Sequence, residues 1–238
     1  MLKRSTVLSF LTAATLSATL APMTMAGPPL LCHEIHICDA KSLPWGKDTF
    51  DKAKSYDAAS VVDDTLKLLD GELPVLARME TIRRAVLYIE RDTSKADKLF
   101  GTLLTRTLDA EVVMDPKVLA LRYFDAGYLA ATFQQAGLET SFQPENGKHD
   151  LHRVPGYAWM VRAWKMDDLN GDMALGLALT TADTRLSEHN MFLERAVKTT
   201  KADDAARNDL LGWISQIRGT TLEAIRAKYA AADAGNER

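Results

Sequence analysis

Apolar residues recur along most of the chain at the three- and four-residue spacing of an amphipathic helix. The clearest series, spaced four, three, four and three, is Val75, Met79, Ile82, Val86 and Ile89. Pro74 fits the first turn of this helix, where its missing N–H is not needed. Because the apolar stripe faces the core, we expect the charged residues of the segment to point elsewhere, namely Arg78, Arg83, Glu90 and Arg91.

The same spacing predicts helices over most of the remaining chain. One passes through Leu99, Leu103, Leu104 and Leu108. The next, from Pro116 to about Ala136, is apolar on most sides and should therefore be central. Further helices are predicted at about 156–168, 172–182, 187–199 and 203–217. Gly219 ends the last of these, and Thr220 with Glu223 predicts a capping box for a final helix. No segment alternates like a strand, so the expected fold class is all-α.

Prolines 74, 116 and 155 open predicted helices at intervals of 42 and 39 residues. Intervals of this size are typical of stacked antiparallel helical hairpins. In layout, the region from about 56 to 230 resembles tetratricopeptide-like or Sel1-like α-helical repeat proteins. The resemblance implies either a tetratricopeptide-like α-solenoid or an irregular helical bundle.

Three segments of different character divide the chain. Residues 1–26 begin with Lys3 and Arg4, continue through an apolar stretch and end in Thr24-Met25-Ala26, the pattern of a cleavable signal peptide. Residues 27–55 are expected to be irregular because of their prolines, and residues 56–238 to form the α-helical domain. The expected location is therefore periplasmic or extracellular, with no transmembrane segment in the mature chain.

Three stretches carry a family resemblance: Gly27-Pro28-Pro29-Leu30-Leu31-Cys32-His33, Ala40-Lys41-Ser42-Leu43-Pro44-Trp45 and Phe124-Asp125-Ala126-Gly127-Tyr128. In these the chain resembles a family of uncharacterised exported helical proteins from bacteria. The resemblance covers most of the mature chain. It implies export and a helical fold, and it implies no catalytic residue.

The charge distribution argues against nucleic acid as a partner. Removing residues 1–26, which contain two cations and no acid, takes the formal charge from −3 to −5. Lysines and arginines alternate with acids along the predicted helices, whereas a phosphate-binding protein normally carries a basic face.

The segment Cys32-His33-Glu34-Ile35-His36-Ile37-Cys38 places two thiols and two imidazoles within seven residues. One interpretation is a disulfide between Cys32 and Cys38, which export permits and which would hold the N-terminal segment. The alternative is a copper or zinc site formed by Cys32, His33, His36 and Cys38, since thiolate and imidazole are the ligands of these metals.

Two further groups of polar residues are candidates for function. His149, Asp150 and His152 lie in a long polar connection and form a possible functional loop that could also contribute metal ligands. Arg122 and Asp125, with Tyr128, lie on the apolar helix from Pro116 to Ala136. They are expected either to form a buried salt bridge between helices or to line a polar pocket.

The sequence contains no nucleophile elbow, phosphate-binding loop, dinucleotide fingerprint or His-Glu-x-x-His motif. A non-enzymatic role is therefore favoured, without a cofactor unless copper or zinc is bound. We expect a binding or scaffolding module for another protein or peptide of the cell envelope, because stacked helical hairpins commonly bind partners on their surfaces. The alternative is an envelope metal-binding protein that uses the Cys32–Cys38 segment.

Overall fold

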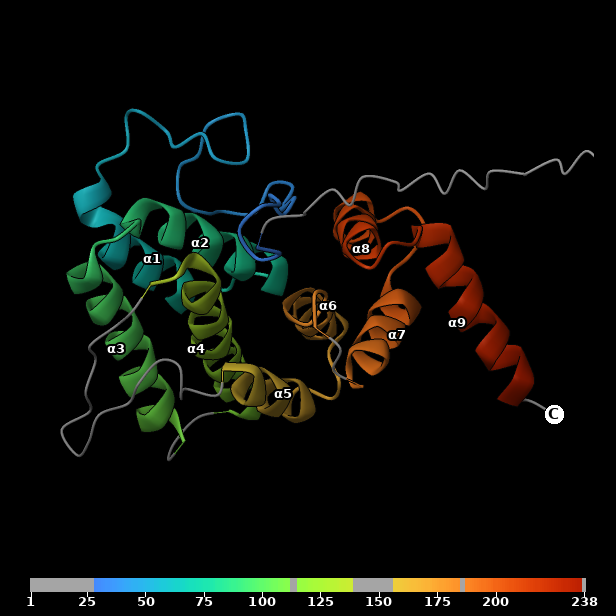
Figure 1. Ribbon diagram of the computed structural model, residues 1–238. Helices are drawn as coiled ribbons and strands as arrows, with labels where there is room; N and C mark the ends of the chain where they lie inside the picture. The colour runs from blue at the N-terminus through green and yellow to red at the C-terminus, as the bar shows by residue number, and fades with distance from the viewer. Residues whose placement is uncertain (1–27, 112–114, 139–155, 185–186, 237–238) are drawn as a thin grey trace, which may run out of the picture.

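The computed structural model describes residues 28–111, 115–138, 156–184 and 187–236 (Figure 1). In this part of the chain there are nine α-helices and no β-strand, which confirms the all-α prediction. After a 3₁₀ turn at Ala58–Ser60, the helices are α1 Val61–Asp70, α2 Val75–Ile89, α3 Thr93–Ala110, α4 Pro116–Ala136, α5 Gly156–Met166, α6 Gly171–Thr180, α7 His189–Thr199, α8 Ala205–Ile217 and α9 Leu222–Asn236. None of the described helices is long and apolar enough to cross a membrane.

Capping residues fix the helix ends close to the predicted positions. Asp115 accepts a hydrogen bond from the Lys117 amide at 2.8 Å and starts α4. Gly219 has a φ of +65°, the left-handed conformation in which a glycine commonly ends a helix. The prediction of a capping box formed by Thr220 and Glu223 is wrong: the Thr221 hydroxyl accepts a bond from the Ala224 amide, and an alanine at that third helical position cannot complete a capping box.

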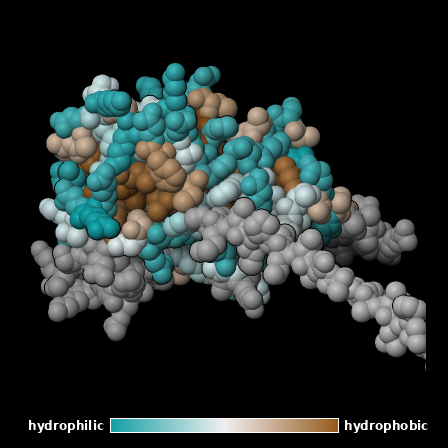
Figure 2. Space-filling model, turned by 45° about the horizontal axis from the view of Figure 1, so that its top comes forward, coloured by the Kyte–Doolittle hydropathy of each residue, from teal (hydrophilic) through white to brown (hydrophobic). Residues whose placement is uncertain are grey.

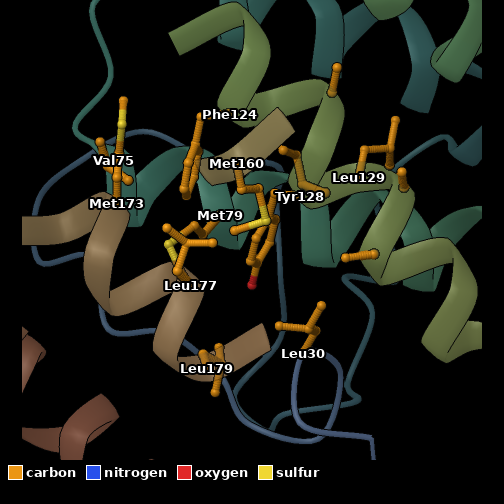
Figure 3. Packing of buried hydrophobic residues seen from close by; sticks show 14 of the residues in the cluster. Leu30, Val75, Met79, Phe124, Tyr128, Leu129, Met160, Met173, Leu177 and Leu179 are labelled. Atoms are coloured by element: carbon orange, nitrogen blue, oxygen red, sulfur yellow. The ribbon is translucent and has the colours of Figure 1, made fainter. Parts of the chain in front are cut away.

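Helices two apart in the chain contact each other: α2 packs on α4, α4 on α6 and α6 on α8. The middle of α4 is buried on all sides, as predicted for a central helix. Figure 3 shows Phe124 and Tyr128 of α4 in one apolar cluster with Met79 of α2 and Leu177 of α6. Because α2 also contacts α6, the three helices α2, α4 and α6 pack against one another, and α8 adjoins α6. A regular solenoid stays a prediction.

Two glycines let α4 and α5 approach closely. A Cβ atom placed on Gly127 would lie 2.6 Å from the carbonyl oxygen of Gly156, and one on Gly156 would lie 2.7 Å from that of Gly127. The backbones of α4 and α5 are therefore in direct contact where the two helices cross, and a larger residue at either position would force the helices apart.

The segment from residue 28 to residue 57 contains no helix and lies across α2 (Figure 1). It has one isolated β-bridge, between Trp45 and Lys52. Its apolar side chains Leu30, Ile35 and Leu43 are each about 1 % exposed and belong to the main core. The segment is therefore an integral layer of the helical domain.

A buried carboxylate on α2 holds this segment in place. Glu80 is fully buried, and its oxygens accept bonds from the guanidinium groups of Arg83, at 2.7 and 2.8 Å, and Arg84, at 2.6 Å. Glu80 also accepts a bond at 3.0 Å from the backbone amide of Ile35. The carboxylate thus joins α2 directly to the N-terminal segment, in surroundings where an unpaired charge would be strongly unfavourable.

The two arginines extend the same network to the backbone of the segment. Arg83 donates to the carbonyl oxygens of Leu31, at 3.3 Å, and Thr49, at 2.9 Å. Arg84 donates to the Leu43 carbonyl at 2.7 Å. Carbonyl groups that a helix or strand would otherwise satisfy are satisfied here by side chains of α2.

The prediction that Arg78 and Arg83 face away from the core is wrong. Arg83 is fully buried beneath the N-terminal segment, and Arg78 is 2 % exposed. Arg78 forms two bonds with Asp125 of α4, at 2.9 and 2.5 Å, and also donates to the carbonyl of Leu69. The apolar stripe of α2 is correct, but other parts of the chain cover the opposite faces as well.

We expect Glu80→Gln to lower the free energy of unfolding by about 3–5 kcal/mol, because it leaves the fully buried Arg83 guanidinium without its anion, whereas the partly exposed Arg84 keeps Glu34 at 3.2 Å. Urea denaturation followed by circular dichroism measures the change. Glu90→Gln is the matched control, since Glu90 is an exposed residue at the end of the same helix and pairs with Lys52 at the surface. The control should change stability by no more than about 0.5 kcal/mol. Equal effects of the two variants would contradict the central role of Glu80.

Candidate functional site

An open groove of about 800 Å³ runs between the N-terminal segment and the α1–α2 hairpin. One wall is the stretch from Asp39 to Pro44. The other wall and the floor come from Tyr56, α1 and the connection to α2, and their lining residues are Tyr56, Asp64, Lys67, Leu68, Gly71, Glu72, Leu73 and Pro74. The volume falls within the range of ligand-binding clefts.

The groove combines apolar surface with charges at exposed positions. Leu68 and Leu73 are partly exposed, while Lys41, Lys67 and Glu72 are exposed at its edges. Figure 2 shows one face of the molecule, on which hydrophobic atoms lie in a hollow that is framed by hydrophilic side chains. A shallow apolar channel with charges of both signs is typical of a surface that contacts another protein.

Three successive residues tie the first wall to α2. The Thr81 hydroxyl lies 3.0 Å from that of Ser42, Arg84 donates to the Leu43 carbonyl at 2.7 Å, and the Tyr88 hydroxyl donates to the Pro44 carbonyl at 2.7 Å. The wall therefore depends on the same face of α2 that carries Glu80.

A half-buried hydrogen bond fixes the floor of the groove. The Tyr56 hydroxyl donates to Asp64 of α1 at 2.9 Å. Burial, with the adjacent Asp64 carboxylate, raises the pKa of Tyr56 far above its ordinary value. Tyr56 thus stays protonated at neutral pH, and Asp64 is already engaged as an acceptor.

The predicted disulfide is absent: Cys32 and Cys38 are free thiols that do not lie close together. Midway between them, the Ile35 side chain is buried and its amide is bound to Glu80, so the chain passes over α2 in an extended form. Cys38 then begins a separate turn with a φ of +50°. Anchoring at Ile35 keeps the seven-residue loop from closing.

Burial raises the pKa of the Cys32 thiol above its ordinary value, although the Arg83 guanidinium acts in the opposite direction. Cys32 is half-buried and Cys38 is exposed. A thiol held protonated is a poor nucleophile and a poor metal ligand, since both roles need the thiolate.

The imidazole of His33 packs on α8. Its Nε2 donates to Asp209 at 2.8 Å, and its ring stacks on Trp213 with 5.1 Å between the centroids. His36 is exposed, with its Nδ1 3.9 Å from the same Asp209 oxygen. The two histidines thus join the N-terminal segment to a helix near the other end of the chain.

The four residues predicted as metal ligands, Cys32, His33, His36 and Cys38, do not assemble into a metal centre here. Over the described residues, no three His, Cys, Asp or Glu side chains form a group that could hold a metal ion. Copper or zinc binding by this segment stays a prediction.

Arg122, Asp125 and Tyr128 occupy three different environments. Asp125 is buried against Arg78, as expected for a salt bridge between helices, and Arg122 pairs with Asp70 of α1 at 2.8 Å. The Tyr128 hydroxyl is buried without a partner among the described residues. The three side chains therefore stabilise helix packing and line none of the hollows described here. His149, Asp150 and His152 lie outside the described residues.

Sequence reasoning did not identify the groove or the arginine pair behind it. One signal was present, because Glu80, Arg83 and Arg84 have the i, i+3 and i+4 spacing of helix ion pairs. The prolines of the first wall indicated only that the segment is irregular. Neither signal could show that the two parts of the chain lie against each other.

Comparison with known proteins identifies no relative: no family model, curated protein or solved structure matches the chain.

We expect Asp209→Asn to loosen the attachment of the N-terminal segment to α8, because His33 loses its charged acceptor. Cys32, next to His33, reports this opening through its alkylation rate in the folded protein, which should rise up to about fivefold. Cys38 serves as the internal standard because it is exposed already. Asp203→Asn, at an exposed position before α8, is the control and should leave the rate unchanged. An unchanged rate in Asp209→Asn would show that this contact does not hold the segment.

Proposed function

We propose that the protein is a binding or scaffolding module, and that its docking site is the groove between residues 39–44 and the α1–α2 hairpin. The occupant is an extended segment of a partner protein in the cell envelope. The observation that carries the proposal is the groove itself, an open apolar channel whose wall is held by hydrogen bonds from side chains of α2.

The shape and chemistry of the groove support a peptide. Leu68, Leu73 and Pro44 supply apolar contacts along it, and Lys41, Lys67 and Glu72 stand at its edges. Apolar anchors with charges around them give a peptide both affinity and orientation. Because the wall is already fixed to α2, little ordering of the protein is needed on binding.

The lining residues favour binding over catalysis. They include no cysteine and no histidine. The Ser42 hydroxyl is bonded to Thr81, and Asp64 is bonded to Tyr56. No nucleophile paired with a base therefore faces the channel, as nucleophilic catalysis would require.

The envelope location of the partner follows from the pattern of residues 1–26, which is that of a cleavable signal peptide. The formal charge of the mature chain and its alternating acids and bases further favour a protein partner over nucleic acid.

Photo-cross-linking in cells that produce the full-length protein tests the proposal. A photoreactive amino acid at Leu73 lies in the groove, and one at Leu108, an exposed leucine of α3, is the matched control. We expect one defined cross-linked protein at position 73 and none at position 108. The purified partner should then bind the wild-type chain and the Leu108→Asp variant, and bind Leu73→Asp at least about tenfold more weakly.

Equal cross-linking at the two positions would place the contact outside the groove. An identified partner that binds Leu73→Asp as well as it binds the wild type would contradict the proposal in the same way. Circular dichroism of both aspartate variants ensures that lost binding is not lost folding.

A further inference from the structure

A second hollow adjoins the groove at Tyr56. Its volume is about 640 Å³, and it lies among residues 52–54, the end of α2 and the first turn of α3. Tyr56 is the one residue that lines both hollows. The two hollows are therefore neighbours on the surface, with the Tyr56 side chain at their boundary.

Tyr88 fixes the position of one hollow relative to the other. Its hydroxyl donates at 2.7 Å to the carbonyl of Pro44, which lines the groove. The same hydroxyl accepts at 3.1 Å from the amide of Ala53, which lines the second hollow. The rings of Tyr88 and Tyr56 are in contact, with 4.7 Å between their centroids. An extended segment that passes the Tyr56 ring would thus move directly from one hollow into the other.

The second hollow carries an excess of positive charge. Four cations and two acids are among its lining residues. The acids are already engaged by two of the cations, since Glu90 pairs with Lys52, and Asp92 pairs with Lys95 at 3.1 Å. Two positive charges are left over at this hollow.

Lys54 and Arg91 are the cations that remain. Both are exposed, and neither has an acidic partner among the described residues. The lining of the groove, by contrast, contains three acids and two lysines. The excess of positive charge is therefore found on one side of Tyr56 only, on a chain whose formal charge is −3.

Exposed cations alone do not hold a free anion, because salt screens charges over about 8 Å and ion pairs at the surface are weak. They contribute when the anion belongs to a segment that is already bound beside them. The second contact is then intramolecular, with an effective concentration in the millimolar range. Leu68 and Leu73 of the groove supply the first, apolar contact for such a segment.

We propose that the occupant of the groove continues past Tyr56 into the second hollow, and that it is a peptide segment whose apolar residues are followed by acidic ones. The apolar residues contact Leu68 and Leu73, and the acidic residues pair with Lys54 and Arg91. This inference rests on the proposed function, because the groove provides the anchor. It adds the charge of the partner segment and the direction in which the segment lies.

The first test is photo-cross-linking from both hollows in cells that produce the full-length protein. A photoreactive amino acid at the exposed position of Lys54 should capture the same partner as one at Leu73. Mass spectrometry of the cross-linked peptides should place both contacts within one continuous stretch of the partner. Aspartates or glutamates should lie at the end of that stretch that position 54 captures.

The second test measures the affinity of the partner captured at position 73 for two double variants. Lys54→Glu with Arg91→Glu should bind it about tenfold more weakly at physiological salt, and the loss should shrink at about 1 M salt. Lys117→Glu with Lys201→Glu is the matched control, because it changes the net charge equally at exposed positions outside both hollows. The control should change the affinity by less than about twofold.

Capture at position 73 without capture at position 54 would overturn the inference and leave the proposed function in place. A captured stretch without acidic residues, or equal effects of the two double variants, would overturn it in the same way. Absence of any partner at position 73 would contradict the proposed function itself, and with it this inference. Circular dichroism of both double variants shows that the fold is retained.

Discussion

The polar contacts between α2 and the N-terminal segment are centred on one buried carboxylate. Glu80 accepts bonds from two guanidinium groups and from the Ile35 amide, and the same guanidinium groups donate to the backbone of the segment. Were the segment removed, Arg83 and Arg84 would lose three carbonyl acceptors, and Glu80 would lose the Ile35 amide. Buried charges of this kind are tolerated only when all their partners are present, so α2 and the segment have to assemble together.

This dependence connects the interior of the molecule to its surface. Residues 42–44 form a wall of the groove because Thr81, Arg84 and Tyr88, on the face of α2 next to Glu80, hold their polar groups. The irregular backbone is therefore held at three successive residues. A fixed wall is what a docking groove requires, and the proposed function rests on it.

The spacing of apolar residues predicted the helices because the residues at that spacing are the ones that pack in the core. The bounds of α2 and α4 follow from apolar spacing, prolines and caps that act within one or two turns.

The predictions failed where distant segments meet. Arg78 and Arg83 were expected outside because their local pattern is amphipathic, whereas Asp125 and the N-terminal segment cover them. The disulfide was inferred from the closeness of Cys32 and Cys38 in sequence, but the anchoring of Ile35 decides their separation in space. Residues 149–152 lie outside the described structure.

The most direct test of this account is the exchange rate of the Ile35 amide hydrogen, measured by NMR in the native protein. If the segment is part of the cooperative core, this amide should exchange only through global unfolding, with the same free energy of opening as amides in the middle of α4. Exchange through a local opening of much lower free energy would show that the segment detaches while the helices remain folded. That result would contradict the central role of Glu80 and the fixed wall of the groove.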